Sequence, residues 1–215
     1  MRRFPLKNLV LSSLLATIAF SCSPIAGYKL VNSTVMNDNM ARPIVNKKIP
    51  LLYKTKIKLY HQRFTGLIVL KQTDSATSHL TFVTEIGMKM FDFEIQNNSF
   101  KLTYLFEPLN KPRITQLLEA DMKLILLQDL LNREGYIYEK KAKRAYKSKG
   151  DDKTYYRVNE KTNTIGQILK KGLVFTKIRV NYFYKEDLIA DQIKLKHYGL
   201  IRLKIELNNL DKKPE

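Results

Sequence analysis

Apolar and polar residues alternate with a period of two along most of the chain from residue 51 onward. In the clearest case, Ile193 to Leu207, the odd positions are mostly aliphatic and the even positions are mostly charged. Similar alternation marks 174–184 and 100–106, and shorter stretches at 55–60, 64–71, 136–140, 154–159 and 163–169, separated by residues that favour turns. Because strand side chains point alternately to opposite faces, this pattern predicts a meander of antiparallel strands with one dry face.

The alternation changes phase once, within the segment 80–95. Apolar residues occupy even positions up to Met90 and odd positions from Phe91 onward. A strand cannot exchange its faces without an extra residue. The phase change therefore predicts a bulge, a sharp bend or a hairpin turn between Gly87 and Phe91.

One segment has helical spacing instead. Pro112 suits a first helical turn and opens the segment 112–132, and Gly135 is a candidate terminator. Residues 124–131 are apolar around most of the helical circumference, so the helix needs cover on several sides, which a flat sheet cannot give. The predicted fold is mainly β (α+β), with a curved antiparallel sheet forming an incomplete barrel around a long apolar helix.

Asp121 lies in the middle of the apolar stripe of this predicted helix. A buried carboxylate is costly unless it is paired. We expect a basic side chain or backbone amides from a neighbouring strand to pair with it. A functional group at the mouth of a pocket is the alternative.

The N-terminal residues follow the order of a secretion signal, with basic residues first, an apolar run next and small residues last. Arg2, Arg3 and Lys7 precede twelve mostly apolar residues, 9–20, and Ser21 and Cys22 close the run. A membrane-spanning helix needs about 20 apolar residues. We therefore expect residues 1–21 to be removed, and a buried N-terminal helix is the alternative.

The end of this segment, Ala19-Phe20-Ser21-Cys22, resembles the lipobox of a bacterial lipoprotein. The resemblance implies that Cys22 is acylated and anchors the chain stably to a membrane, and a free thiol is the alternative. Ser23 follows instead of Asp, which by resemblance to known sorting signals favours the outer membrane, facing the periplasm. Residues 22–50 would then be the acylated cysteine and a flexible tether, and 51–215 one domain.

The net charge and the composition limit the classes of partner and of activity that the chain can have. The net charge is +18, or +15 without residues 1–21, and for an exported protein phospholipid or lipopolysaccharide head groups are better partners than nucleic acid. The basic run that includes Lys140, Lys141, Lys143 and Arg144 is either a head-group contact or a solvated hairpin loop. One cysteine, three scattered histidines and no recognisable catalytic motif predict no enzyme, metal or cofactor.

The order of elements in 51–207 resembles the LolA/LolB group of periplasmic lipoprotein carriers and receptors. The segments FTGLIVLK (64–71) and TEIGMKMFDF (84–93) and the helix 112–132 are similar to that family's early strands, strand-glycine-strand element and lid helix. The resemblance implies an incomplete barrel whose inner face and lid helix enclose the acyl chains of a lipid or lipoprotein.

An acyl site needs a deep apolar cleft. The residues expected to line it are Phe82, Met88, Met90, Phe91, Phe93, Leu124, Leu127 and Leu131, and the alternative is that they fill a core. Two functions stay open. The first is an anchored lipoprotein that binds acyl chains in envelope transport or localisation, and the second is a non-enzymatic envelope lipoprotein that docks a protein partner.

Overall fold

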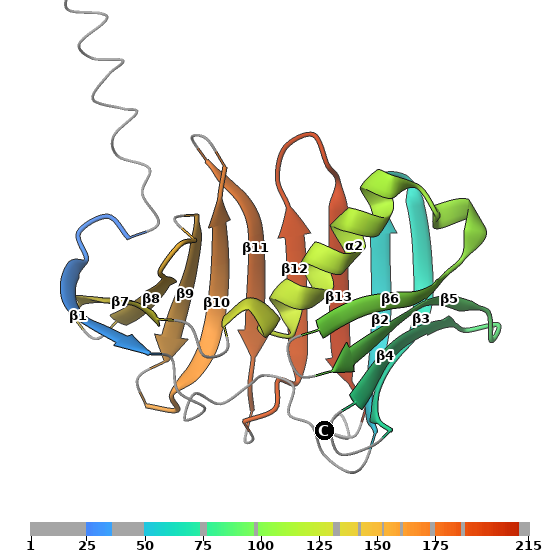
Figure 1. Cartoon of the computed structure of the whole chain (residues 1–215), viewed down its shortest axis with the longest axis horizontal. Coiled ribbons are helices and arrows are strands. Elements are labelled where there is room, and N and C mark those ends of the chain that lie inside the picture. The colour runs from blue at the N-terminus through green and yellow to red at the C-terminus, as the bar shows by residue number, and fades with distance from the viewer. Residues whose placement is uncertain are drawn as a thin grey trace, which may run out of the picture.

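A computed structural model of the chain describes residues 25–35, 50–73, 77–96, 99–130, 134–141, 143–151, 153–159, 161–172, 175–185 and 188–210. Thirteen strands of these residues form one antiparallel sheet that does not close (Figure 1). One α-helix of the described part, α2 (Pro112–Ile125), runs obliquely across one face of the sheet (Figure 1). The predicted mainly β fold with an open antiparallel sheet is confirmed.

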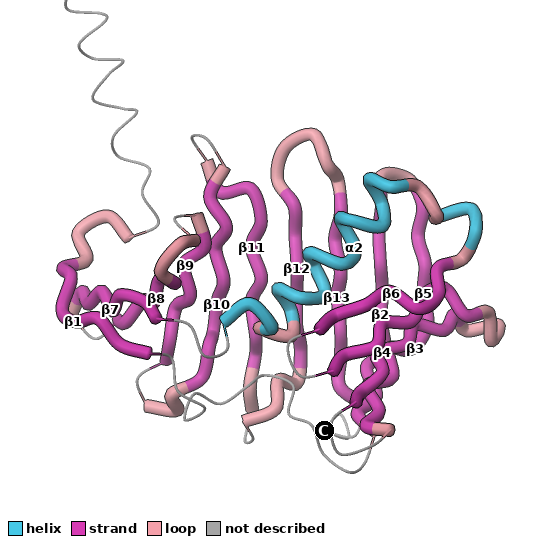
Figure 2. The backbone as a smooth tube through the Cα atoms, in the orientation of Figure 1, coloured by secondary structure: helices cyan, strands magenta, loops and turns pink. Residues whose placement is uncertain are grey.

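Two meanders make up the sheet. The first contains β2 (Leu51–Leu59), β3 (Gln62–Gln72), β4 (Thr77–Thr84), β5 (Lys89–Gln96) and β6 (Ser99–Leu105). The second contains β7 (Glu134–Lys140), β8 (Lys143–Ser148), β9 (Thr154–Asn159), β10 (Thr164–Lys171), β11 (Thr176–Phe183), β12 (Gln192–His197) and β13 (Leu203–Asn209). Pairing of β13 with β2 joins the two, and β1 (Lys29–Val35) extends the β7 edge. Figure 2 shows β4, β5 and β6 turning away from the direction of β2 and β3, so the sheet curls around α2.

The apolar face of the alternating strands forms the core. Ile193, Leu195, Leu203, Ile205 and Leu207 are all buried, as the odd positions predict. The segment 193–207 is two strands joined by a hairpin, however, and the turn at 198–202 includes Gly199 at φ 109°. The hairpin preserves the alternation because β12 and β13 present their odd residues to the same face.

The phase change near Met90 has two causes, a hairpin turn and a bulge, and both are among the three predicted alternatives. A turn with Gly87 at φ 82° joins β4 to β5. The register then shifts, since Phe82 pairs with Phe91 whereas Val83 pairs with Lys89. Met90 is the extra residue, and both Met90 and Phe91 are therefore buried.

The helix is shorter than predicted, and Gly135 does not terminate it. It ends at Ile125, it is amphipathic, and Gly135 lies within β7. Leu127 adopts a left-handed conformation with φ 58°, and a short 3₁₀ helix, η2 (Gln128–Leu130), follows. Leu126, Leu127 and Leu130 are buried, so the apolar run covers the core as a turn rather than as further helix. No helix of the described residues is long and apolar enough to cross a membrane.

Two strands were not predicted. Residues 29–35 pair with β7 as β1, so the expectation of a flexible linker is wrong for these residues. The basic run at 140–149 is not one solvated loop, because β8 occupies most of it and pairs with both β7 and β9. Both strands are polar or basic, and neither shows a sustained apolar alternation.

Candidate functional site

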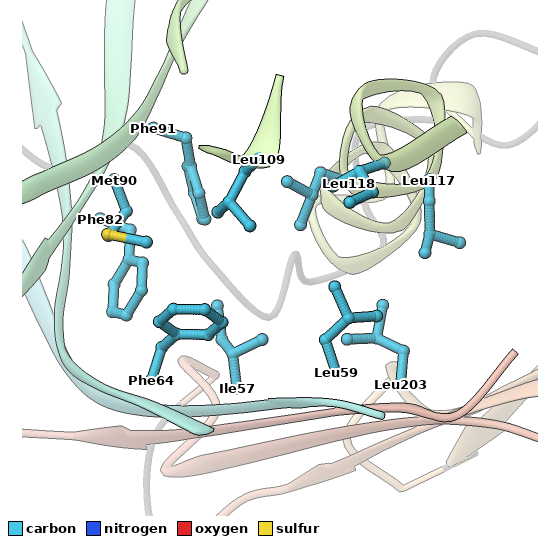
Figure 3. Close-up of a pocket in the computed structure, with 11 residues that line it drawn as sticks. Ile57, Leu59, Phe64, Phe82, Met90, Phe91, Leu109, Leu117, Leu118 and Leu203 are labelled. Atoms are coloured by element: carbon cyan, nitrogen blue, oxygen red, sulfur yellow. The ribbon is translucent and has the colours of Figure 1, made fainter. Parts of the chain in front are cut away.

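An apolar pocket lies between the first half of α2 and the sheet (Figure 3). Its walls come from β2, β3, β4, β5 and β13, from the 3₁₀ helix η1 (Glu107–Leu109) and from α2. All eleven lining residues are apolar, namely Ile57, Leu59, Phe64, Phe82, Met90, Phe91, Leu109, Ile114, Leu117, Leu118 and Leu203. An apolar ligand could enter such a pocket without desolvating any polar side chain.

The pocket has a buried floor and a half-exposed rim. Ile57, Phe82, Met90, Phe91, Leu118 and Leu203 are buried, whereas Leu59, Phe64, Leu109, Ile114 and Leu117 are partly exposed. The free space is about 20 Å³. That is room for about one water molecule, and drug-sized ligands occupy pockets of roughly 300–1,000 Å³. In this conformation the interior is nearly filled by side chains.

A buried Asp–His pair fastens α2 to the sheet. His197 Nε2 of β12 lies 2.9 Å and 2.8 Å from the two carboxylate oxygens of Asp121, and the side chains are 2% and 1% exposed. Burial raises the pKa of Asp121 above its usual value, although the hydrogen bond with His197 acts in the opposite direction. Asp121 is thus paired with a basic side chain from a neighbouring strand, as the sequence predicts.

A tyrosine caps the end of the helix. The Tyr182 hydroxyl of β11 lies 3.3 Å from the Leu124 carbonyl oxygen and 3.0 Å from the Ile125 carbonyl oxygen. The last carbonyls of a helix lack the helical N–H four residues further on. The Leu124 carbonyl also accepts from the Leu127 N–H at 3.3 Å, and Tyr182 adds a side-chain donor for the Leu124 and Ile125 carbonyls. Burial also raises the pKa of Tyr182 well above its usual value, which keeps the hydroxyl protonated as a donor.

The two halves of α2 are held differently. Asp121, Leu124 and Ile125 in the second half are buried and are joined to β11 or β12 by the hydrogen bonds above. The first half has no side-chain hydrogen bond at its N-cap Lys111, and Ile114 and Leu117 are only partly buried. The second half is therefore the anchored end, and the first half covers the pocket.

The predicted lipid-binding residues lie in different surroundings. Phe82, Met90 and Phe91 line the pocket. Phe93 and Leu127 are buried in the core outside this lining, and Leu124 is buried beside a polar groove on the other side of α2. Met88 is 36% exposed near the β4–β5 turn. Leu131 and Cys22 lie outside the described residues.

The predicted head-group contacts lie at the tip of the β7–β8 hairpin. Lys140 Nζ donates to the Ala26 carbonyl oxygen at 3.1 Å, and Arg144 Nε donates to Glu139 Oε1 at 2.9 Å. Lys141 and Lys143 are exposed. Lys140 and Arg144 thus already have partners within the chain.

The polar groove beside Leu124 is larger than the apolar pocket, with a volume of about 310 Å³. It contains charges of both signs, since Lys123 Nζ lies 2.6 Å from Glu119 Oε1 and both Asp151 and Lys170 line its wall. Six of its nine lining residues are polar or charged, so the groove suits an acyl chain less well than the apolar pocket does.

Several residues of the site were not predicted. The lining residues Leu59, Leu109 and Leu203 lie far apart in the sequence, and only the folded sheet brings them together. The sequence does indicate that His197 is buried, because His197 occupies an odd, inward-facing position of the alternation at 193–207.

No known protein family and no curated protein matches the chain. Three solved structures have a similar architecture. A LolA superfamily protein from Nitrosomonas europaea is 7% identical with a TM-score of 0.44, and the match covers 94% of each chain. A domain described as an outer membrane lipoprotein-sorting protein, from Vibrio parahaemolyticus, is 9% identical with a TM-score of 0.39, covering 77% of this chain and 85% of that one. A DUF1329 family protein from Desulfovibrio piger is 10% identical with a TM-score of 0.38, covering 76% and 84% respectively. LolA superfamily and lipoprotein-sorting proteins are thus among the structural neighbours, and the function has to be argued from the site itself.

Proposed function

We propose that the chain is a membrane-anchored periplasmic lipoprotein that binds the acyl chain of a lipid or lipoprotein in the apolar pocket under α2. Acylated Cys22 would hold it on the outer membrane. The observation that carries the proposal is the composition of the pocket, in which all eleven lining residues are apolar and five of them form an accessible rim. A site for a polar or charged ligand would need hydrogen-bonding side chains in that lining.

Binding requires the pocket to open, because about 20 Å³ cannot hold an acyl chain. The two halves of α2 suggest how this happens. The second half stays fixed through Asp121–His197 and Tyr182, while the first half and η1 move outward and uncover the floor. The apolar surface exposed by this movement would be covered again by the ligand, which offsets the cost of opening.

The nearly filled interior also supports a second candidate. A docking scaffold needs a solid core and no ligand space, and the small free volume agrees with that function. The two candidates differ in one measurable property, the binding of an apolar ligand by the purified chain.

The test uses residues 23–215, which contain every described element. N-phenylnaphthylamine, an apolar fluorescent probe, should bind with a rise in fluorescence, and lysophosphatidylglycerol should displace it. In the variant Ile114→Phe/Leu117→Phe, larger side chains at the rim should weaken probe binding about tenfold, since overpacking costs about 1–3 kcal/mol.

The matched control is Leu30→Phe/Leu188→Phe, in which both leucines are exposed and lie outside the pocket. This variant should bind the probe like the wild-type chain. Absence of probe binding by the folded wild-type chain, or an equal loss in both variants, would contradict the acyl-binding proposal and favour the scaffold.

A further inference from the structure

Five cations form one continuous row on the outer face of the sheet. Strand register places Arg179 opposite Lys196, Lys196 opposite Lys204, Lys204 opposite Lys58, and Lys58 opposite Arg63. These residues, called here the basic row, come from the five adjacent strands β11, β12, β13, β2 and β3. Adjacent strands lie about 4.8 Å apart, so the row extends over roughly 20 Å.

Such a row destabilises the free protein. Like charges directly opposite each other on a sheet repel, and neighbours at this spacing lie well within a Debye length of about 10 Å at 0.1 M salt. Among the described residues, no ion pair neutralises any member of the row, and Arg179 Nε has no hydrogen-bond partner there. Other cations of the chain do pair, for example Lys89 with Asp92 and Lys149 with Glu134.

The neighbouring row of side chains on the same face does not consist of like charges alone. There Glu206 lies opposite both Lys194 and Lys56, so the signs alternate. The basic row itself has no acidic member. Glu206 lies on the same face at the diagonal spacing of roughly 7–8 Å, and its single charge offsets only part of the repulsion among the five cations.

Apolar groups protrude beside the row. Leu200 at the tip of the β12–β13 hairpin is 97% exposed, and Tyr60 at the β2–β3 turn is 50% exposed. Tyr198 contacts two of the cations, with Lys196 Nζ 4.7 Å and Arg179 Cζ 5.4 Å from its ring centroid. Aromatic and aliphatic side chains next to cations are typical of surfaces that sit at the head-group level of a bilayer.

From this juxtaposition we infer that the basic row and the Tyr198–Leu200 hairpin tip form a docking surface for an anionic phospholipid membrane, with the cations on the lipid phosphates and Leu200 among the upper acyl carbons. The inference is independent of the acyl-binding proposal. An extended row of like charges suits a plane of phosphate groups better than a single small anion, and the exposed leucine has no role in binding a free ion.

The basic row and the apolar pocket lie on opposite faces of the same strands. Along the same strand ends, Lys58 precedes Leu59, Arg63 precedes Phe64, and Leu203 precedes Lys204. In each pair one residue lies in the row and the other lines the pocket, since successive strand residues point to opposite faces. Docking through the row would therefore leave the pocket on the face of the sheet that is turned away from the membrane.

The test measures co-sedimentation of residues 23–215 with vesicles of phosphatidylglycerol mixed with phosphatidylcholine, and with vesicles of phosphatidylcholine alone. The wild-type chain should bind only the anionic vesicles, and binding should be lost when salt rises from about 0.1 M to about 1 M. Each Lys or Arg near an anionic surface contributes about 1 kcal/mol, a factor of roughly five. The variant Lys58→Gln/Lys196→Gln/Lys204→Gln should therefore bind roughly a hundredfold more weakly.

The matched control is Lys71→Gln/Lys153→Gln/Lys161→Gln, which removes the same charge from exposed lysines outside the row. It should keep most of the binding, while Leu200→Ser in the wild-type background should weaken it. The row variant should melt at a higher temperature than the wild-type chain, because like-charge contacts are removed. Equal loss in the row variant and the control would overturn the inference. So would equal affinity for neutral vesicles, or equally tight binding of inorganic phosphate, polyglutamate or DNA.

Discussion

Removing the partner of His197 should detach the anchored half of α2 from the sheet. In the variant Asp121→Leu, Nε2 of His197 loses the carboxylate that accepts its hydrogen bond. Among the described residues, Nδ1 has no partner in the wild-type chain either. The imidazole would then be buried with both nitrogens unpaired.

The magnitude follows from the burial of the pair. An unsatisfied buried polar group costs about 1–3 kcal/mol, and more when the group left unpaired is charged. Both side chains are at most 2% exposed, so solvent cannot compensate. We expect Asp121→Leu and His197→Leu each to lower the free energy of unfolding by roughly 3 kcal/mol.

The double variant Asp121→Leu/His197→Leu separates the pairing from the packing. Replacing a buried pair by apolar residues of similar volume is often neutral or stabilising. We therefore expect the double variant to be within about 1 kcal/mol of the wild-type chain, which corresponds to a large coupling energy between the two sites.

Urea unfolding of residues 23–215 at pH 7, followed by far-ultraviolet circular dichroism, measures these differences, and the slope m reports whether the transition stays two-state. The exposed pair Lys149–Glu134, with a similar 2.9 Å separation, is the control, and Lys149→Ala should leave the midpoint unchanged. The reasoning is refuted if Asp121→Leu is as stable as the wild-type chain, or if the double variant is no more stable than the single variants.

Three further variants test the surrounding structure. Tyr182→Phe removes the donor to the Leu124 and Ile125 carbonyls and should cost about 1–2 kcal/mol in urea unfolding, whereas the exposed Tyr104→Phe should cost almost nothing. Since burial raises the pKa of Asp121 above its usual 3.8, the wild-type chain should lose stability relative to Asp121→Asn as pH rises above about 3.8, and a pH-independent difference would contradict this. Gly66→Ala should destabilise by about 1–3 kcal/mol or more because the new Cβ meets the Val83 carbonyl oxygen, while Gly166→Ala, with open space at that position, should be nearly neutral.

The strands could be predicted because their signal is local. Alternation at 193–207 reports which face of each strand is buried, whatever the rest of the fold does. The strands β1 and β8 lack that signal, since their stability comes from pairing with β7, which the sequence does not reveal. The end of the helix at Ile125 could not be predicted either. A left-handed backbone conformation is unfavourable for leucine, and Leu127 adopts it with its side chain buried in the core.

The candidate site was predictable only in part. Phe82, Met90 and Phe91 could be selected as apolar residues near the phase change. Their contact with Leu109 and Leu203 depends on strand order and on the position of α2, neither of which a periodic pattern encodes. The pairing of Asp121 with His197 could be half-predicted, because each is a polar residue at a position that the periodicity assigns to the interior, but 76 residues separate them.

The central claim is that an acyl chain lodges under the first half of α2 while the second half stays fixed. Pulsed electron–electron double resonance, which measures the distance between two spin labels, tests this claim on residues 23–215. These residues contain no cysteine. One pair of labels is attached at Arg113→Cys and Gln62→Cys, two exposed positions near the pocket rim. A second pair at Lys123→Cys and Lys194→Cys reports on the anchored half. On addition of lysophosphatidylglycerol, the account predicts that the 113–62 distance lengthens while the 123–194 distance stays constant. Ligand binding that leaves both distances unchanged would contradict it.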